Sequence, residues 1–234
     1  MMYRKDLNDR SPLRVFEKSI HGGLGRGNIG VAVGRHGVGK TPFLVGVALD
    51  DLLRGRRVLH VALNQPWDKV REYYDEIFTD LARTAGLEDA GLARREMERF
   101  RNIHTFLGHS FSVQRLKEAI VLLKEYGQFV PEAIMLDGFD FENATVEGIL
   151  ELRQVARDLN AEMWMTAVMH RDAARDARGI PEPLSRVAEA VSVIVRLKGD
   201  GKVVHISLLK DHENQDVSTL SIALNPTTML LMQE

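Results

Sequence analysis

The sequence predicts an α/β fold with a mostly parallel central sheet, helices on both faces and an antiparallel C-terminal edge. Through the first two thirds of the chain, short apolar runs rich in Val, Ile and Leu alternate with amphipathic segments. This alternation, with helices of about 10 to 15 residues, is typical of parallel strands joined by helices. In the last third, two apolar runs flank Gly199-Asp200-Gly201, which is a hairpin signal.

The composition fits one globular domain. The chain has 234 residues, 44% of them hydrophobic, and a formal net charge of −2, so no overall positive charge draws it to nucleic acid or to an anionic membrane. Because it has no cysteine, disulfides, thiolate metal sites and cysteine nucleophiles are excluded. No segment reaches the roughly 18 apolar residues of a membrane helix, and the N-terminus is polar. We therefore expect a cytoplasmic protein with no membrane partner.

The first elements are short. Residues 1–12 carry mixed charges and end in Ser-Pro, which predicts a flexible N-terminal arm ahead of a domain spanning 13–234. Residues 13–20 can form a helix, and the glycine-dense stretch after them allows a sharp turn. Residues 29–33 are apolar and β-branched, as in a buried strand, and residues 42–53 have the pattern of a helix.

Between this strand and helix lies Gly34-Arg35-His36-Gly37-Val38-Gly39-Lys40-Thr41, a complete G-x-x-x-x-G-K-[ST] motif. Its glycines let backbone N–H groups gather around one anion, and the helix start adds partial positive charge. Lys40 would reach the terminal phosphates, Thr41 would bind Mg²⁺ through its hydroxyl, and Pro42 suits the first helical turn. The alternative is an ordinary glycine turn with a surface lysine. The expected cofactors are ATP and Mg²⁺, and the expected cofactor-binding residues of this stretch are Gly34, Gly37, Val38, Gly39, Lys40, Thr41 and Pro42.

Strands and helices continue to alternate after the motif. Further parallel strands are expected at 58–63, 103–107, 133–136 and 163–169. The helices between and after them are expected at 66–83, 88–101, 113–126 and 145–159, the last capped by Thr145. The antiparallel edge is expected at 191–198, 203–209, 220–224 and 229–232.

Several polar residues follow the parallel strands directly. Gly34, Asn64, Asp137 and His170 all stand at expected carboxyl ends, which is the edge where open α/β sheets bind their ligands. Asp137 comes after four apolar residues, so its carboxylate can hold the Mg²⁺ that Thr41 coordinates. The alternative is an aspartate that only begins a turn with the glycine that follows it.

The start of the chain resembles a known superfamily. A short helix, the Gly22-Gly23-Leu24 turn, Arg26-Gly27 before a strand and the motif at 34–41 resemble the opening of the RecA-like P-loop ATPases, in particular the branch with KaiC, RadA and the DnaB-type helicase core. The match is specific over residues 13–65. The resemblance implies a RecA-like fold, and it implies that a polar residue at the position of His170 senses the γ-phosphate. A surface or packing role is the alternative for this histidine.

The resemblance also implies a catalytic glutamate at the end of the second strand, where this chain has Asn64-Gln65-Pro66. An amide can hold a water molecule by hydrogen bonds but cannot accept its proton. We therefore expect slow or impaired hydrolysis, with Asn64 and Gln65 as the residues in the catalytic position. Asp140 and Glu142, in the loop after Asp137, are the alternative bases.

A further implication of the resemblance is assembly. RecA-like ATPases place a lysine or arginine of a late strand near the γ-phosphate of the neighbouring protomer. Lys210 stands at that point, followed by His212 where relatives carry an arginine. The resemblance implies a homo-oligomer, such as a hexameric ring, with Lys210 catalytic in trans. The alternative is an exposed strand-end lysine without a partner.

Two functions follow as hypotheses. The first is a Mg-ATP-binding RecA/KaiC-like protein with slow hydrolysis that acts as a nucleotide-dependent oligomeric switch or scaffold. The second is an active DNA-dependent ATPase of helicase or recombinase type. Residues 171–183 take the place of a nucleic-acid-contacting loop, but their charges sum to zero, so nucleic-acid binding is not indicated. These charges are Arg171, Arg175 and Arg178 against Asp172, Asp176 and Glu182.

Overall fold

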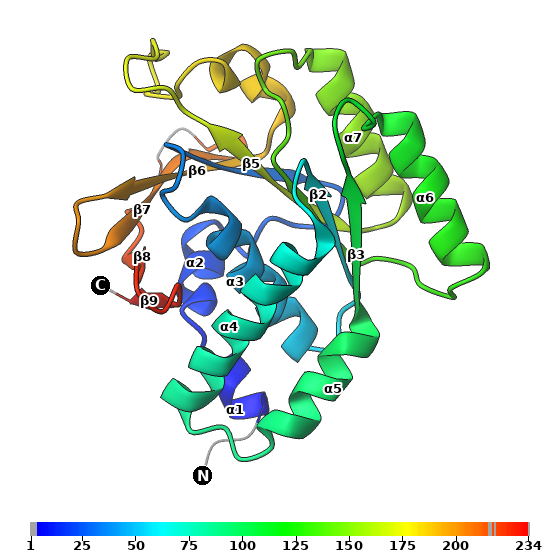
Figure 1. Ribbon diagram of the computed structural model, residues 1–234. Helices are drawn as coiled ribbons and strands as arrows, with labels where there is room; N and C mark the ends of the chain where they lie inside the picture. The colour runs from blue at the N-terminus through cyan, green and yellow to red at the C-terminus, as the bar shows by residue number, and fades with distance from the viewer. Residues whose placement is uncertain (1–3, 215–216, 218, 234) are drawn as a thin grey trace.

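The computed structural model describes residues 4–214, 217 and 219–233. These residues form one nine-stranded sheet in the order β3-β2-β4-β5-β1-β6-β7-β8-β9, with helices on both sides (Figure 1). Neighbouring strands from β3 to β6 are parallel, and those from β6 to β9 are antiparallel. The predicted α/β fold, with a mostly parallel sheet and an antiparallel C-terminal edge, is therefore confirmed.

The elements have the following bounds. The strands are β1 (Ile29–Gly34), β2 (Val58–Leu63), β3 (Arg101–Phe106), β4 (Ala133–Asp137), β5 (Glu162–Val168), β6 (Val193–Gly199), β7 (Val204–Asp211), β8 (Ile222–Leu224) and β9 (Leu231–Gln233). The helices are α1 (Arg4–Asp9), α2 (Leu13–Ser19), α3 (Lys40–Leu53), α4 (Trp67–Ala85), α5 (Ala90–Phe100), α6 (Val113–Glu125), α7 (Val146–Asp158) and the 3₁₀ helix η1 (Leu184–Ala190).

The N-terminal segment differs from its prediction. Residues 4–9 form helix α1, which packs against α3, and Leu7 is buried in the core. The expectation of a flexible arm is therefore wrong over these residues, because one apolar side chain anchors a segment that is otherwise polar. The first three residues of the expected arm lie outside the described part of the chain.

The sheet separates two apolar cores. Strands β1, β2 and β4 are buried along their whole length, as expected for central parallel strands covered on both faces. One core lies under α1 to α5, and the other under α6, α7 and η1 (Figure 1). In the first core, Trp164 of β5 lies so close to β1 that a Cβ on Gly30 would be 2.6 Å from its ring. Only glycine permits this contact between the two strands.

The strand register defines the edge that carries the predicted site. Gly34 lies opposite both Val168 and Leu197, and Asp137 lies opposite Ala62. The carboxyl ends of β1, β2, β4 and β5 therefore meet at one edge of the sheet. Lys210 instead pairs with Ile194, near the beginning of β6, which places it towards the opposite edge.

Candidate nucleotide site

The motif at 34–41 forms a tight loop between β1 and α3. Gly37 and Gly39 have φ values of +75° and +105°, in the left-handed region that favours glycine. A Cβ on Gly34 would lie 2.7 Å from Cγ1 of Val38 and 2.9 Å from the carbonyl oxygen of Leu197. The glycines of the motif are therefore required by the backbone path of the loop and by its close contact with β6.

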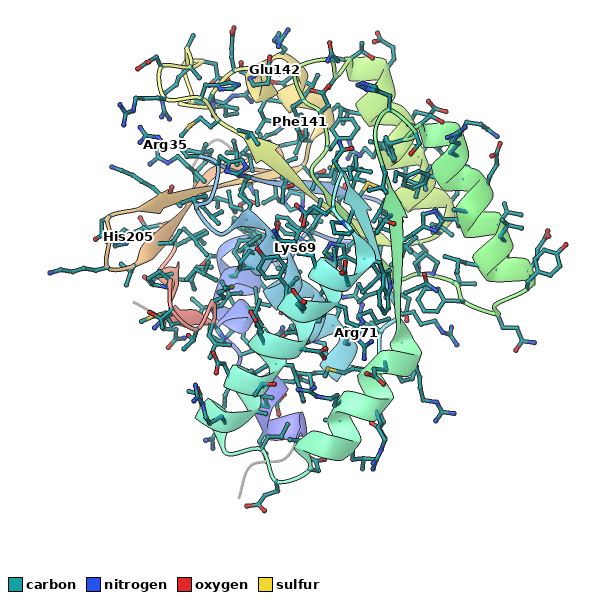
Figure 2. The ribbon with its side chains drawn as sticks, in the orientation of Figure 1. Arg35, Lys69, Arg71, Phe141, Glu142 and His205 are labelled. Atoms are coloured by element: carbon teal, nitrogen blue, oxygen red, sulfur yellow. The ribbon has the colours of Figure 1, made fainter. Side chains whose placement is uncertain are left out.

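The lysine of the motif closes this loop from inside. Nζ of Lys40 donates to the carbonyl oxygens of Gly34 at 3.2 Å and Arg35 at 2.8 Å. Burial lowers the pKa of the Lys40 amine, while the carboxylate of Asp137 acts in the opposite direction. Arg35, by contrast, projects from the outside of the loop (Figure 2).

The start of α3 leaves backbone donors for an anion. The first N–H groups of an α-helix have no acceptor within the helix. No side chain caps this helix start, since the N-cap residue is Gly39. Together with the partial positive charge of the helix start, these N–H groups are donors of the kind that can bind a phosphate group.

Asp137 is the centre of the site. Its side chain is buried at the end of β4, with the whole residue 2% exposed. Its Oδ2 accepts hydrogen bonds from the Thr41 hydroxyl at 2.6 Å and from Nε2 of Gln65 at 3.2 Å. Its Oδ1 accepts one from the Thr166 hydroxyl at 2.7 Å. The three donors are uncharged, so they fix the carboxylate without neutralising it.

Asn64 and Gln65, the two residues expected in the catalytic position after β2, differ in their contacts. Asn64 is exposed with a φ of +59°, and its backbone N–H donates to the carbonyl oxygen of Phe106 at 2.8 Å. Gln65 turns inward and reaches Asp137 with its amide. Of these two residues, the structure therefore brings Gln65 into contact with the predicted metal-binding carboxylate.

The remaining candidates at this edge lie on its rim. His170 is exposed, and its Nε2 lies 3.2 Å from Oε1 of Glu142, which stands in the loop above the sheet edge (Figure 2). Glu142 also lies within 3.6 Å of Arg186, and the carboxylate of Asp140 binds the backbone N–H of Glu142 at 3.0 Å. Both alternative bases are thus engaged in local contacts.

Lys210 is not part of this cluster. It is 5% exposed, and its Nζ donates to the carbonyl oxygen of Ala188 in η1 at 2.9 Å. Burial lowers the pKa of its amine. The alternative of an exposed strand-end lysine without a partner is therefore wrong, and the amine that was expected to act in trans forms a hydrogen bond within its own chain. The following His212 binds Asp211 through Nδ1 at 2.8 Å.

Thr166 was missed by the sequence analysis. It lies on β5, beside the strand that ends in Asp137, and it is 2% exposed. The one available signal was a hydroxyl in the otherwise apolar run Met163-Trp164-Met165-Thr166-Ala167-Val168. A buried hydroxyl needs a hydrogen-bond partner, but the strand order that supplies this partner is a tertiary property.

The residues that the structure describes contain no group of three or more His, Cys, Asp or Glu side chains that could hold a metal ion. None of the described helices is both long enough and apolar enough to span a membrane.

Comparisons with models of known protein families and with curated proteins gave no match to this chain.

Proposed function

We propose that the protein has a RecA-like fold, binds Mg-ATP in the loop at 34–41 and hydrolyses it slowly. The observation that carries this proposal is the 2.6 Å hydrogen bond between Thr41 and Asp137, two residues 96 positions apart. It joins the hydroxyl of the glycine motif to a buried carboxylate on another strand. An ordinary glycine turn with a surface lysine gives no reason for such a pairing.

The residues fit a magnesium-bound nucleotide. The open N–H groups at the start of α3 and the amine of Lys40 would hold the phosphates, and Thr41 and Asp137 would hold the metal ion. Because Asp137 is fixed only by uncharged donors, none of them would compete with a divalent cation as its positively charged partner. When bound, Mg²⁺ would stabilise negative charge on the terminal phosphate.

Slow hydrolysis follows from Gln65. Its amide can orient a water molecule, but it cannot take the proton of that water. The amide also donates to Asp137, which ties it to the carboxylate that would hold the metal. Asp140 and Glu142 are the nearest alternative carboxylates along the chain, and both have local partners.

Slow turnover suits a nucleotide-dependent switch or scaffold in a homo-oligomer, because a nucleotide that is hydrolysed slowly keeps its complex in one state. We assign Lys210 no role in this assembly, since its amine is bound to Ala188. The alternative, a DNA-dependent ATPase, gains little from residues 171–183, where Arg178 is paired with both Asp176 and Glu189.

Lys40→Ala tests the proposed function. Titration calorimetry with Mg-ATP should show binding by the wild type and a loss of at least about 100-fold in the variant, because one cationic partner of the phosphates is removed. Lys69→Ala is the matched control, since Lys69 is exposed on α4 (Figure 2). The steady-state hydrolysis rate of the wild type should lie below about 1 s⁻¹. Equal affinities of wild type and Lys40→Ala would contradict nucleotide binding in this loop.

A further inference from the structure

We infer that Thr166 is a positioning residue of the nucleotide site: it fixes the carboxylate of Asp137 so that the other carboxylate oxygen faces Thr41. The inference rests on the proposed function. The bond from the Thr166 hydroxyl goes to Oδ1 of Asp137, whereas Thr41 and Gln65 both bind Oδ2. Thr166 thus holds the side of the carboxylate that points away from the glycine motif.

The hydroxyl of Thr166 has a fixed orientation. It donates its hydrogen to Asp137 at 2.7 Å and accepts the backbone N–H of Gly138 at 2.8 Å. A hydroxyl has one hydrogen to donate, so a rotation that redirects it would leave the buried carboxylate without this donor. Because Thr166 is β-branched, its χ1 angle is also restricted.

The hydrogen bond from the N–H of Gly138 to the Thr166 hydroxyl fixes the turn that follows Asp137. Gly138 has a φ of +85°, and a Cβ on it would lie 2.9 Å from the carbonyl oxygen of Leu63. This turn therefore packs directly against the end of β2, two residues before Gln65. By holding the N–H of Gly138, Thr166 joins β5 to the two strand ends that carry Asp137 and Gln65.

Filling the volume at this position does not require a hydroxyl. Met165 and Ala167, the neighbours on β5, are fully buried apolar residues, and valine would fill the same volume as threonine. Valine would, however, leave both Oδ1 of Asp137 and the N–H of Gly138 without this partner. Since residues that hold a metal ligand typically change metal affinity by about 10- to 100-fold, the effect of the hydroxyl should fall on Mg²⁺-dependent nucleotide binding.

The test compares Thr166→Val with Thr166→Ser, which keeps the hydroxyl. Titration calorimetry with ATP is carried out with Mg²⁺ and again with excess EDTA. We expect Thr166→Val to lower the affinity in Mg²⁺ by about 10- to 100-fold and to change the affinity in EDTA much less. Thr166→Ser should restore most of the loss. Thr105→Val on β3 is a matched control, because it makes the same change on a strand that does not border β4.

A second measurement needs no nucleotide. Hydrogen exchange at the amide of Gly138 should be faster in Thr166→Val than in the wild type, and close to the wild-type rate in Thr166→Ser. Wild-type affinity in Mg²⁺ together with unchanged Gly138 exchange in Thr166→Val would overturn the inference. A wild type that binds no ATP would instead overturn the proposed function. The exchange measurement would then still show whether the hydrogen bond between Thr166 and the N–H of Gly138 is present.

Discussion

The two ends of helix α3 hold buried carboxylates in opposite ways. Beside its N-terminal end, Asp137 is bound by uncharged donors only. At its C-terminal end, Asp50 and Asp51 are 7% and 5% exposed and are paired with arginines. These ion pairs join Asp50 to Arg14 and to Arg54, the latter at 2.7 Å, and Asp51 to Arg56 at 2.6 Å.

We interpret the difference as that between a structural cluster and the proposed nucleotide site. An arginine beside a buried carboxylate neutralises its charge and fixes its geometry, so nothing further needs to bind. A carboxylate that is held only by uncharged donors keeps its charge while its position is set. Removing an arginine from Asp50 or Asp51 should therefore lower the stability of the fold. Removing an uncharged donor from Asp137 should instead lower the affinity for the ligand.

Arg56→Ala should show the largest effect on stability. The Arg56 guanidinium binds Asp51 at 2.6 Å, the carbonyl oxygen of Glu132 at 3.2 Å and the Glu162 carboxylate at 3.4 Å. At pH 9, urea denaturation should show a loss of about 3 kcal/mol in the free energy of unfolding, because Asp51 is left buried without its cation. The affinity for Mg-ATP should stay within about threefold of the wild type.

The matched control for Arg56→Ala is a double variant, Asp51→Leu with Arg56→Met, which replaces the pair by apolar groups. It should recover most of the loss, since removing both partners leaves no buried charge. If Arg56→Ala lost less than about 1 kcal/mol, or if it abolished nucleotide binding, the distinction between the two ends of α3 would not hold.

The pH dependence of stability should show the next largest effect. Burial raises the pKa of Asp51 to about 8 and that of Glu17 to about 7, with Arg56 and Arg14 respectively opposing the rise. In the unfolded chain these carboxyls titrate near pH 4, so between about pH 4 and 8 the folded protein binds more protons. Stability should therefore fall as pH rises through this window. Urea denaturation at pH 5 and pH 8 should differ by about 2 kcal/mol after allowance for solvent screening.

Asp51→Asn should flatten this profile, because the amide does not titrate. Asp140→Asn, which removes an exposed carboxylate in the loop after β4, is the matched control. A wild-type protein that became more stable between pH 5 and pH 8 would mean that the arginines keep Asp51 ionised throughout the window.

The parallel sheet and the glycine motif could be predicted because their signals are local. A strand buried on both faces is a continuous apolar run, and β2 therefore has the bounds read from the sequence. The motif at 34–41 is recognised by its fixed spacing. It follows β1 directly, so it lies at the same edge of the sheet as Asp137. That strand ends meet at one edge also followed from the sequence, but the hydrogen bond between Gln65 and Asp137 was not predicted.

The missed features depend on partners that are distant in the sequence. The buried position of Lys210 was missed because the acceptor of its amine, the carbonyl oxygen of Ala188, lies in η1, 22 residues earlier in the chain. The role inferred for Thr166 depends on the pairing of β5 with β4. Leu7 is a single apolar residue among charges, so no pattern marked it as a core residue. In each case the sequence shows the residue but not the strand or helix that surrounds it.

Asp137→Asn should have the smallest effect on stability, and its sign should be opposite to that of Arg56→Ala. The change removes a buried charge that has only uncharged donors, while it keeps the size of the side chain and an oxygen for Thr41 and Gln65. Since a buried charge without a direct counter-ion costs free energy, the nucleotide-free variant should be more stable by about 1 kcal/mol. Urea denaturation without nucleotide measures this gain, and calorimetry should show a loss of about 10- to 100-fold in affinity for Mg-ATP. If Asp137→Asn were instead destabilised as strongly as Arg56→Ala, the carboxylate would be a structural anchor like those at the C-terminal end of α3, and its uncharged donors would no longer indicate a binding site.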